Sequence, residues 1–459
     1  MKANKKQNTT KLALFAGAAA LAAFTPQARA QTSMDTLLNK LEQKGVLTVD
    51  EAKELKAENA TNSATDFKTA FDSKMKLPDY VTGYKISGDF RGRFDQTSAA
   101  NNNHYVNRAR ERFRLRFGIV ANIVDNMEVG FRLTSGDAAQ GSSNQGNPLS
   151  NNSTLQNNGT KKGIWIDTAY AKWTAINNGE WLMAATIGKM DNLFNFTPMV
   201  FDPDYTPEGA FINTAYTVND HHTIALTGAA FVLDEEGGST QDPALYGGQA
   251  LLNSKWTPKL ASSVGIGALL IGSPQQLTTG NVPYQNQGNT RSAGGVLLNH
   301  YNPIVADANV TYALDSFPLY TGVFPIKVGG EYINNPGADK NNMGFWVGAT
   351  LGKSGKKHTW DLTYRYEYLQ ADAWYDQLVD DDMVAYYQNA PVGAAGGTGA
   401  VGGTNVKGHM VKLNYSITDS LTFSLTGYVT DLVDQKLTGN VLEPDSTMIH
   451  VMADLMWKF

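Results

Sequence analysis

Residues 448–459 at the end of the chain read Met-Ile-His-Val-Met-Ala-Asp-Leu-Met-Trp-Lys-Phe. Taken in steps of two, one face of this stretch is apolar and consists of Ile449, Val451, Ala453, Leu455, Trp457 and Phe459. The opposite face is mostly polar and consists of Met448, His450, Met452, Asp454, Met456 and Lys458. A period of two predicts a β-strand that separates an apolar environment from a polar one.

The same period recurs from Tyr80 onward and predicts sixteen strands. The expected ranges are 82–95, 108–122, 126–135, 164–175, 180–189, 209–218, 221–233, 246–256, 259–272, 303–315, 320–333, 342–353, 357–369, 406–417, 420–432 and 446–459. Strands of this length cross a bilayer at a tilt of about 45°. The fourth strand is ambiguous, because Trp165, Ala169, Ala171 and Trp173 indicate a lipid-facing side but Asp167 shares their parity.

The connections between these strands alternate between long and short. Long segments such as 96–107, 136–163, 190–208 and 370–405 alternate with tight turns such as Val124-Asp125 and Asn177-Asn178-Gly179. Short periplasmic turns and long outer loops are typical of a transmembrane barrel. The fold class predicted for residues 78–459 is therefore all-β, a 16-stranded antiparallel transmembrane β-barrel. An even strand number places both termini in the periplasm.

The amino terminus resembles an export signal. Lys2, Lys5, Lys6 and Lys11 precede an apolar run over 12–24, and Ala28-Arg29-Ala30 fits a cleavage site. The run is shorter than the ~20 residues that a membrane-spanning helix needs. We therefore expect residues 1–30 to be removed. The whole chain has a net charge of −5, and the five basic residues of this segment leave −10 on the mature chain.

Residues 31–77 differ from the rest of the chain. Residues 34–42 have a helical apolar pattern, Gly45 ends it, and a capping box at Thr48 starts a second helix. The segment is too short to bury a core of its own. We expect a short periplasmic helical leader with a linker, and both a coiled coil between copies and a disordered leader stay open.

The composition narrows the class of protein. The chain has no Cys, a slightly negative mean hydropathy of −0.31, and many Gly and aromatic residues. No apolar run near 18 residues follows residue 30, which argues against a helical membrane protein. No nucleophile elbow, HExxH motif, cysteine site or phosphate-binding loop is present. We therefore expect no enzyme activity, no cofactor, no metal and no nucleic-acid partner.

The second predicted strand carries arginine at every second position from Arg108 to Arg116. These side chains point to one face, and that face is expected to line the interior because Arg near the bilayer midplane costs ~2–4 kcal/mol. The first and third strands extend the patch. The expected pore-lining residues, called here the arginine wall, are Arg91, Arg93, Arg110, Arg112, Arg114, Arg116 and Arg132.

Two interpretations of the arginine wall stay open. A basic wall along a hydrated lumen attracts anions. Alternatively, the arginines pair with Asp and Glu in an internal salt-bridge lattice that stiffens the barrel. Asp89, Asp95 and Glu128 lie on the same face, and the mature chain is acidic, so any anion preference is expected to be weak.

The third long loop carries the sequence Phe201-Asp202-Pro203-Asp204-Tyr205-Thr206-Pro207-Glu208. Its prolines restrict the backbone. If the loop folds into the barrel, Asp202, Asp204 and Glu208 face the arginine wall and produce a transverse field at a constriction. If it does not, it lies on the outer surface. Another acidic stretch, Asp380-Asp381-Asp382, is interpreted as a solvated loop rather than a calcium site.

Several short motifs together resemble the bacterial putative-porin family, which is distantly similar to phosphate-selective porins. They are Leu37-Leu38 with Leu41, Lys44-Gly45-Val46-Leu47-Thr48, Ile166-Asp167-Thr168-Ala169-Tyr170, Gly188-Lys189-Met190, Asp202-Pro203-Asp204, Pro207-Glu208-Gly209 and the terminal Phe459. The resemblance implies a 16-stranded barrel, a homotrimer in the bacterial outer membrane, and contact with lipid and lipopolysaccharide. It also implies that Phe459 is read by the barrel-assembly machinery.

The resemblance implies passive diffusion of small polar solutes and ions through a water-filled barrel. Few lysines lie in the outer loops, which argues against a dedicated phosphate channel. Two other functions stay open. A structural barrel held to the cell wall would need a binding site in the leader, and an outer-membrane hydrolase would need a His beside a Ser or Asp, which the seven scattered His residues do not indicate.

Overall fold

The computed structural model describes residues 78–459, except for 100–105, 140–143, 239, 388–390, 392–398 and 436–445. The chain divides into two compact units, Met1–Asp79 and Tyr80–Phe459. All described strands belong to the second unit. The expected signal peptide and helical leader lie outside the described residues. Within the described part of the chain, no helix is long and apolar enough to cross a membrane.

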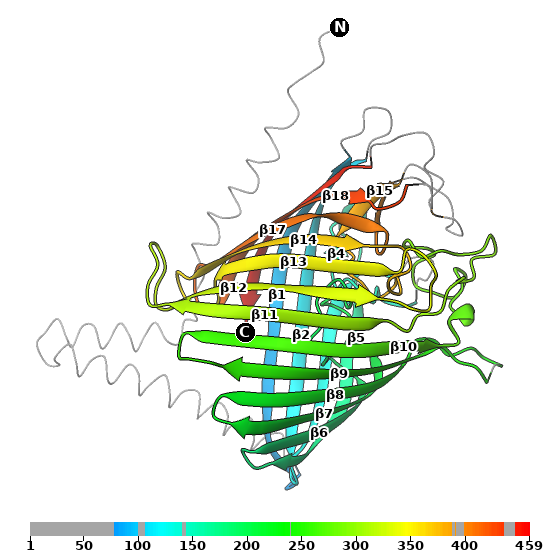
Figure 1. Ribbon diagram of the computed structural model, residues 1–459. Helices are drawn as coiled ribbons and strands as arrows, with labels where there is room; N and C mark the ends of the chain where they lie inside the picture. Colours follow the sequence, from blue (N-terminus) through cyan, green and yellow to red (C-terminus); the bar gives the residue numbers. More distant parts are fainter. Residues whose placement is uncertain are drawn as a thin grey trace, which may run out of the picture. The chain divides into compact units, whose positions relative to one another are not determined.

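Sixteen long antiparallel strands form one closed ring in the described unit (Figure 1). They are β1 (Val81–Ala99), β2 (Asn107–Ile123), β3 (Met127–Gly136), β5 (Gly163–Asn177), β6 (Trp181–Lys189), β7 (Glu208–Asn219), β8 (His222–Val232), β9 (Ala244–Lys255), β10 (Leu260–Gly272), β11 (Ile304–Leu314), β12 (Phe324–Asn334), β13 (Met343–Gly352), β14 (Trp360–Leu369), β17 (Val406–Ser416), β18 (Leu421–Leu432) and β19 (Met448–Lys458). The ring closes where β1 pairs with β19, from Asp89 opposite Lys458 to Ala99 opposite Met448. The predicted 16-stranded barrel is thereby confirmed.

Short elements lie in the long connections. The strand β4 (Ser153–Thr154) pairs with Arg112 and Phe113 of β2, and β15 (Val384–Tyr387) pairs with β16 (Gly399–Gly402) in a separate two-stranded sheet. Two single 3₁₀ turns, η1 (Asn157–Gly159) and η2 (Pro274–Gln276), complete the described elements. These pieces give the loops internal structure without adding strands to the ring.

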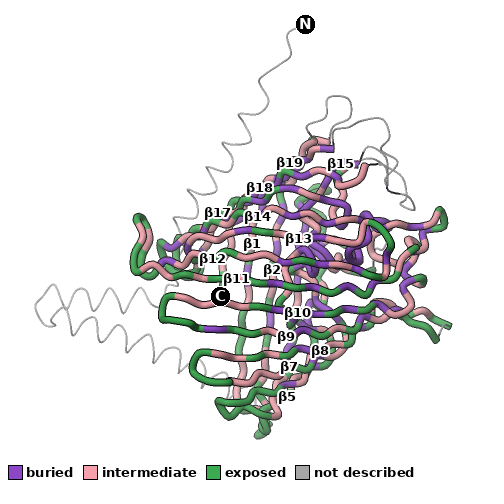
Figure 2. The backbone as a smooth tube through the Cα atoms, viewed as in Figure 1, coloured by how far each residue is buried: buried purple, intermediate pink, exposed green. Residues whose placement is uncertain are grey.

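Buried and exposed residues alternate along many strands, as the colours of the tube in Figure 2 show. In β10, Val264 and Ile266 are 54% and 57% exposed, whereas Leu269 and Ile271 are 2% exposed. A membrane barrel places apolar side chains on its outer surface, where lipid replaces water, so exposed Ile and Val are expected there. The alternation predicted for the last strand is also observed, since Asp454 and His450 are buried on the inner side.

The short turns have the chemistry that tight antiparallel connections need. Between β2 and β3, Asp125 and Asn126 both have positive φ, at 61° and 59°. Asn and Asp tolerate this left-handed conformation, and such turns match the twist of paired strands. The predicted alternation of short turns and long loops is therefore present around the ring.

A β-bulge in β5 resolves the ambiguity of the fourth predicted strand. The register with β3 shifts between Arg132 and Leu133, so that Asp167 lies between the paired residues Ile166 and Thr168. One inserted residue changes which surface each later side chain points to, because side chains alternate between the two faces of a strand. Asp167 is consequently buried inside. The prediction that Trp165 faces lipid is wrong, since its Nε1 donates to the carbonyl of Gly136 on the inner side.

Two long loops enter the barrel. The third loop, residues 190–207, and the described part of the seventh loop, from residue 370 to residue 387, contribute many of the buried apolar residues inside the ring. They pack against strands β7 to β12 through residues such as Phe211, Phe231 and Leu269. One part of the wall is therefore covered by apolar loop residues, and the arginine wall belongs to the other part.

Candidate solute pathway and its constriction

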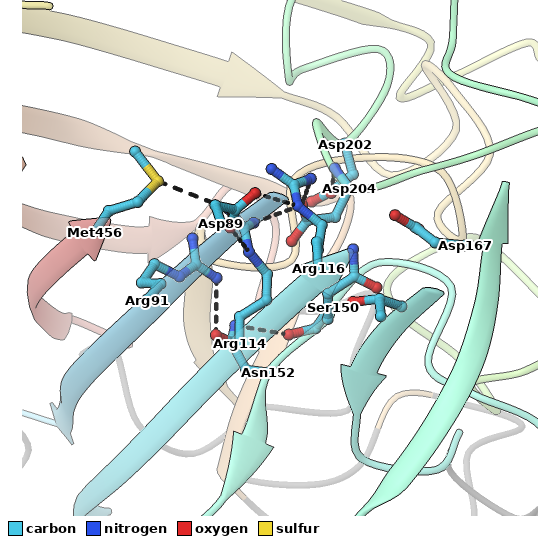
Figure 3. A network of polar contacts seen from close by, with 12 residues as sticks. Asp89, Arg91, Arg114, Arg116, Ser150, Asn152, Asp167, Asp202, Asp204 and Met456 are labelled. Atoms are coloured by element: carbon cyan, nitrogen blue, oxygen red, sulfur yellow. Dashed lines mark hydrogen bonds and ion pairs between the residues drawn. The ribbon is translucent and has the colours of Figure 1, made fainter. Parts of the chain in front are cut away.

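The innermost arginines of β2 bind carboxylates on β1 and on the third loop. Arg114 donates to Asp89 at 2.8 Å and to Asp204 at 3.2 Å, and Arg116 donates from Nε to Asp89 at 2.7 Å (Figure 3). These contacts follow from the register, because Asp89 lies directly opposite Arg116 on β1. Asp204 thus joins the third loop to the wall.

Nearer the outer end of the barrel, Asp95 holds two further arginines. Arg110 lies 2.8 Å and Arg112 3.4 Å from the same Asp95 oxygen. The other oxygen of Asp95 lies 3.3 Å from Nε2 of His450 on β19. Arg112 also donates to the hydroxyl of Ser150 in the second loop. One carboxylate therefore offsets the charge of two guanidinium groups.

Two wall arginines are fixed by carboxylates that the sequence analysis did not assign. Arg93 donates from Nε and Nη2 to both oxygens of Asp454, at 2.8 and 3.0 Å, which is a bidentate pair. It also lies 3.4 Å from Asp382 in the seventh loop. Arg132 contacts Asp167, which the β-bulge in β5 turns inward, and Asp191 at the start of the third loop.

Arg91 differs from the other six members of the arginine wall. Its Nη2 donates to Oδ1 of Asn152 at 2.7 Å (Figure 3). No described carboxylate lies within 4 Å of its guanidinium group, whereas the other six each have at least one. The wall is therefore mostly an ion-pair lattice that contains one unpaired guanidinium group.

The third loop is fixed to the opposite wall. Thr197 donates from its backbone N and from its hydroxyl to the two carboxylate oxygens of Glu331 on β12. Nε1 of Trp374 in the seventh loop donates to the carbonyl of Val200 at 2.8 Å. The predicted inward folding of this loop is thus present in the structure, with anchors at both the barrel wall and a second loop.

The seventh loop forms the rest of the obstruction in the lumen. Its backbone binds the third loop at two points, from Asp202 N to Leu378 O at 2.7 Å and from Asp380 N to Pro198 O at 3.0 Å. Trp374 is fully buried and meets the ring of Phe201 edge-on, with centroids 6.1 Å apart. The interpretation of Asp380-Asp381-Asp382 as a solvated loop is wrong, because apolar neighbours draw this segment into the barrel.

The two loops bring acidic side chains together. Carboxylate oxygens of Asp202, Asp380 and Asp381 lie within 4.8 Å of one another. Burial raises the pKa of Asp202 and of Asp381 well above the usual range, and the neighbouring carboxylates raise both pKa values further. Burial also acts on Asp382, but the nearby Arg93 keeps the pKa of that carboxyl below its usual value. Asp202 and Asp381 therefore gain protons at a higher pH than ordinary carboxyls do, and Asp382 does not.

Glu208 lies apart from the other predicted constriction residues. It is the first residue of β7 and is exposed, and its carboxylate lies 3.0 Å from Nζ of Lys189 at the end of β6. Asp204 contacts the arginine wall and Asp202 contacts the seventh loop. Asp202 and Asp204 thus belong to the constriction, whereas Glu208 lies at the base of the loop.

A cavity of about 350 Å³ lies between the arginine wall and the two loops. Its basic lining consists of Arg91, Arg93, Arg114, Arg116, Arg365 and Lys412. Its acidic lining consists of Asp202, Asp204, Asp380, Asp381, Asp382 and Asp454. Opposite charges thus face one another across a polar space, which is the arrangement expected where hydrated solutes pass.

Sequence reasoning missed the seventh loop and the inward carboxylate of Asp454. Asp454 was detectable in principle, since it lies on the polar face of the last strand and that strand closes the ring against β1. The seventh loop gave a weaker signal. Its segment Ala373-Trp374-Tyr375 and Leu378-Val379 is apolar, which is unusual for a loop in water.

Residues 96–268 match the model of the putative porin family. The match confirms the resemblance found in the sequence motifs. It covers β2 to β10 with their loops and includes most of the arginine wall and the third loop.

Solved structures of outer-membrane proteins align over most of the chain at low identity. A high-pH structure of OprB from Pseudomonas putida is 10% identical, covers 84% of this chain and 96% of its own, and has a TM-score of 0.49. The channel DcaP of Acinetobacter baumannii is 12% identical with 82% and 97% coverage and a TM-score of 0.39. Salmonella typhi OmpF in complex with daunomycin is 8% identical with 83% and 99% coverage and a TM-score of 0.44. Among curated proteins, none matches the chain.

Proposed function

We propose that this protein is an outer-membrane porin through which small hydrophilic solutes and ions diffuse passively. The observation that supports this most directly is the polar, charge-lined cavity inside a closed barrel whose outer surface is apolar. The match to putative porins points the same way, toward a channel rather than an enzyme. We further propose a homotrimer in the outer membrane, with both termini in the periplasm.

The pathway runs between the arginine wall and the acidic loops. The third and seventh loops set its width, because they are bound to each other and to β12. Charge preference is weak, since six of the seven wall arginines already pair with described carboxylates. Anions are slightly preferred, because Arg91 and Lys412 line the cavity without an ion pair to any described residue. Asp202 and Asp381 also have none, but burial raises the pKa of both carboxyls and so weakens their negative charge.

The test is the conductance of the purified protein in planar bilayers. We expect stepwise insertion of open, ohmic channels and a small reversal potential of the anion-preferring sign in a gradient of KCl. Replacing Arg91 by Gln should move the reversal potential toward cations, while the channels still open. The proposal is overturned if pure, folded protein inserts into the bilayer and no conductance follows.

A further inference from the structure

Some of the charged side chains that line the cavity form ion pairs with one another, and others do not. Arg93 pairs with Asp454 and Asp382, Arg114 pairs with Asp204, and Arg365 pairs with Asp380. These groups neutralise one another over distances of 2.8 to 3.4 Å. They fix the geometry of the cavity but leave little field for a passing solute, because paired charges cancel beyond a few ångströms.

Arg91 is the exception on the basic side. Among the described residues, its one hydrogen-bond partner is Asn152, which it contacts through Nη2, and its Nε is buried without a partner there. A guanidinium group has five N–H donors, so donors of Arg91 remain unused beside a polar cavity that the side chain itself lines. Desolvated donors of a charged group left unpaired are costly, and an anionic ligand would offset that cost.

Asn152 orients the side chain of Arg91. Its Oδ1 accepts from Arg91, and its own Nδ2 donates to the hydroxyl of Ser150 at 3.1 Å. Asn152 and Ser150 are both buried, so the side chain of Arg91 is held from the second loop on one side. A fixed guanidinium fork suits a planar carboxylate, whose two oxygens accept parallel N–H bonds.

We propose that Arg91, oriented by Asn152, forms a binding subsite for the carboxylate group of small monoanionic solutes. This inference rests on the proposed porin function and names the class of solute that the constriction favours. The remaining unpaired lining charges are Lys412 on one side and Asp202 and Asp381 on the other. No excess positive charge is left to compensate a second negative charge, so dicarboxylates and phosphate bind more weakly than monocarboxylates.

The test measures inhibition of the KCl current through single wild-type channels by added propionate, succinate or inorganic phosphate. Propionate is expected to inhibit saturably and at a lower concentration than either dianion. In Arg91→Gln, the half-inhibiting propionate concentration should rise about threefold to tenfold, as for loss of a charged hydrogen bond partly screened by water. Arg91→Lys keeps the charge but loses the fork, and should give an intermediate value.

Lys85→Gln is the matched control. Lys85 lies on β1 with the same parity as Arg91, is exposed, and does not line the cavity. Its removal changes net charge equally and should leave propionate inhibition unchanged. The inference is overturned if Arg91→Gln behaves like Lys85→Gln, or if succinate or phosphate inhibits more strongly than propionate, in channels that conduct normally. Absence of any wild-type conductance instead rejects the porin function itself.

Discussion

The buried pair between Arg93 and Asp454 shows how single residues hold the barrel closed. Arg93 lies on the first strand and Asp454 on the last, directly opposite in the register. Their bidentate contact therefore joins the two ends of the barrel sequence across the closing seam. Both side chains are largely buried, at 6% and 11% exposure, so each charge depends mainly on its protein partners.

Asp454→Asn is expected to destabilise the folded barrel by about 2 kcal/mol, because Arg93 loses its bidentate partner and keeps only the longer contact with Asp382. Unfolding by urea in lipid vesicles measures this change. Glu208→Gln, which breaks a contact whose carboxylate is 65% exposed, serves as the control and should cost far less. Equal losses in the two variants would contradict the importance assigned to the seam.

At the residue scale, sequence reasoning identified which arginines face inward but not what they contact. The position of a residue within a strand determines whether its side chain points inward or outward, because successive Cβ atoms point to opposite faces. Partners depend on the register between distant strands and on loops that enter the barrel. Arg114 illustrates this, since one of its carboxylates comes from β1 and the other from the third loop.

At the scale of elements, the third and seventh loops act as one unit inside the barrel. They share backbone hydrogen bonds and an aromatic contact, and Glu331 fixes the third loop to β12. The sequence left open whether the third loop folds inward or lies on the outer surface. It did not identify the inward seventh loop, since whether an apolar loop segment is buried depends on what faces it.

Glu331→Leu should loosen the third loop. The substitution removes the acceptor of two bonds from Thr197 and leaves its N–H unpaired, at a cost of about 1–3 kcal/mol. That cost is large enough to populate displaced positions of the loop. Single-channel recordings should show higher conductance and more current noise than the wild type. Unchanged, quiet channels would mean that the seventh loop alone fixes the constriction.

The acidic cluster formed by both loops predicts a dependence of selectivity on pH. Burial and neighbouring carboxylates raise the pKa of Asp202 and Asp381, so these groups gain protons at a higher pH than ordinary carboxyls do. Lowering the pH from neutral toward about 5 therefore removes negative charge from the lumen, within the range where ordinary carboxyls stay ionised. The reversal potential in a KCl gradient should shift toward anions.

The variant Asp202→Asn with Asp381→Asn separates this cluster from other titrating groups. Because both side chains are then neutral at every pH, its reversal potential at neutral pH should resemble that of the wild type at lower pH. It should also respond little to further acidification. A double variant that keeps the full wild-type response would assign the pH dependence to other groups.

At the scale of the whole molecule, the fold was predictable because one physical constraint acts on every strand. Backbone groups in a bilayer must be hydrogen-bonded within the protein, which leaves closed barrels and helices as spanning structures. Alternation and the order of short and long connections then specify the strands. The exception was β5, where the bulge at Asp167 reversed the facing of Trp165.

The barrel has an apolar outer surface and a polar interior. Spin labels on β17 test this arrangement. The chain has no Cys, so single cysteines at Val411, Lys412, Leu413 and Asn414 can be labelled without background. In lipid vesicles, labels at 411 and 413 should collide mainly with oxygen dissolved in the bilayer. Labels at 412 and 414 should collide mainly with a water-soluble relaxation agent. Uniform accessibility along the four positions would contradict the account.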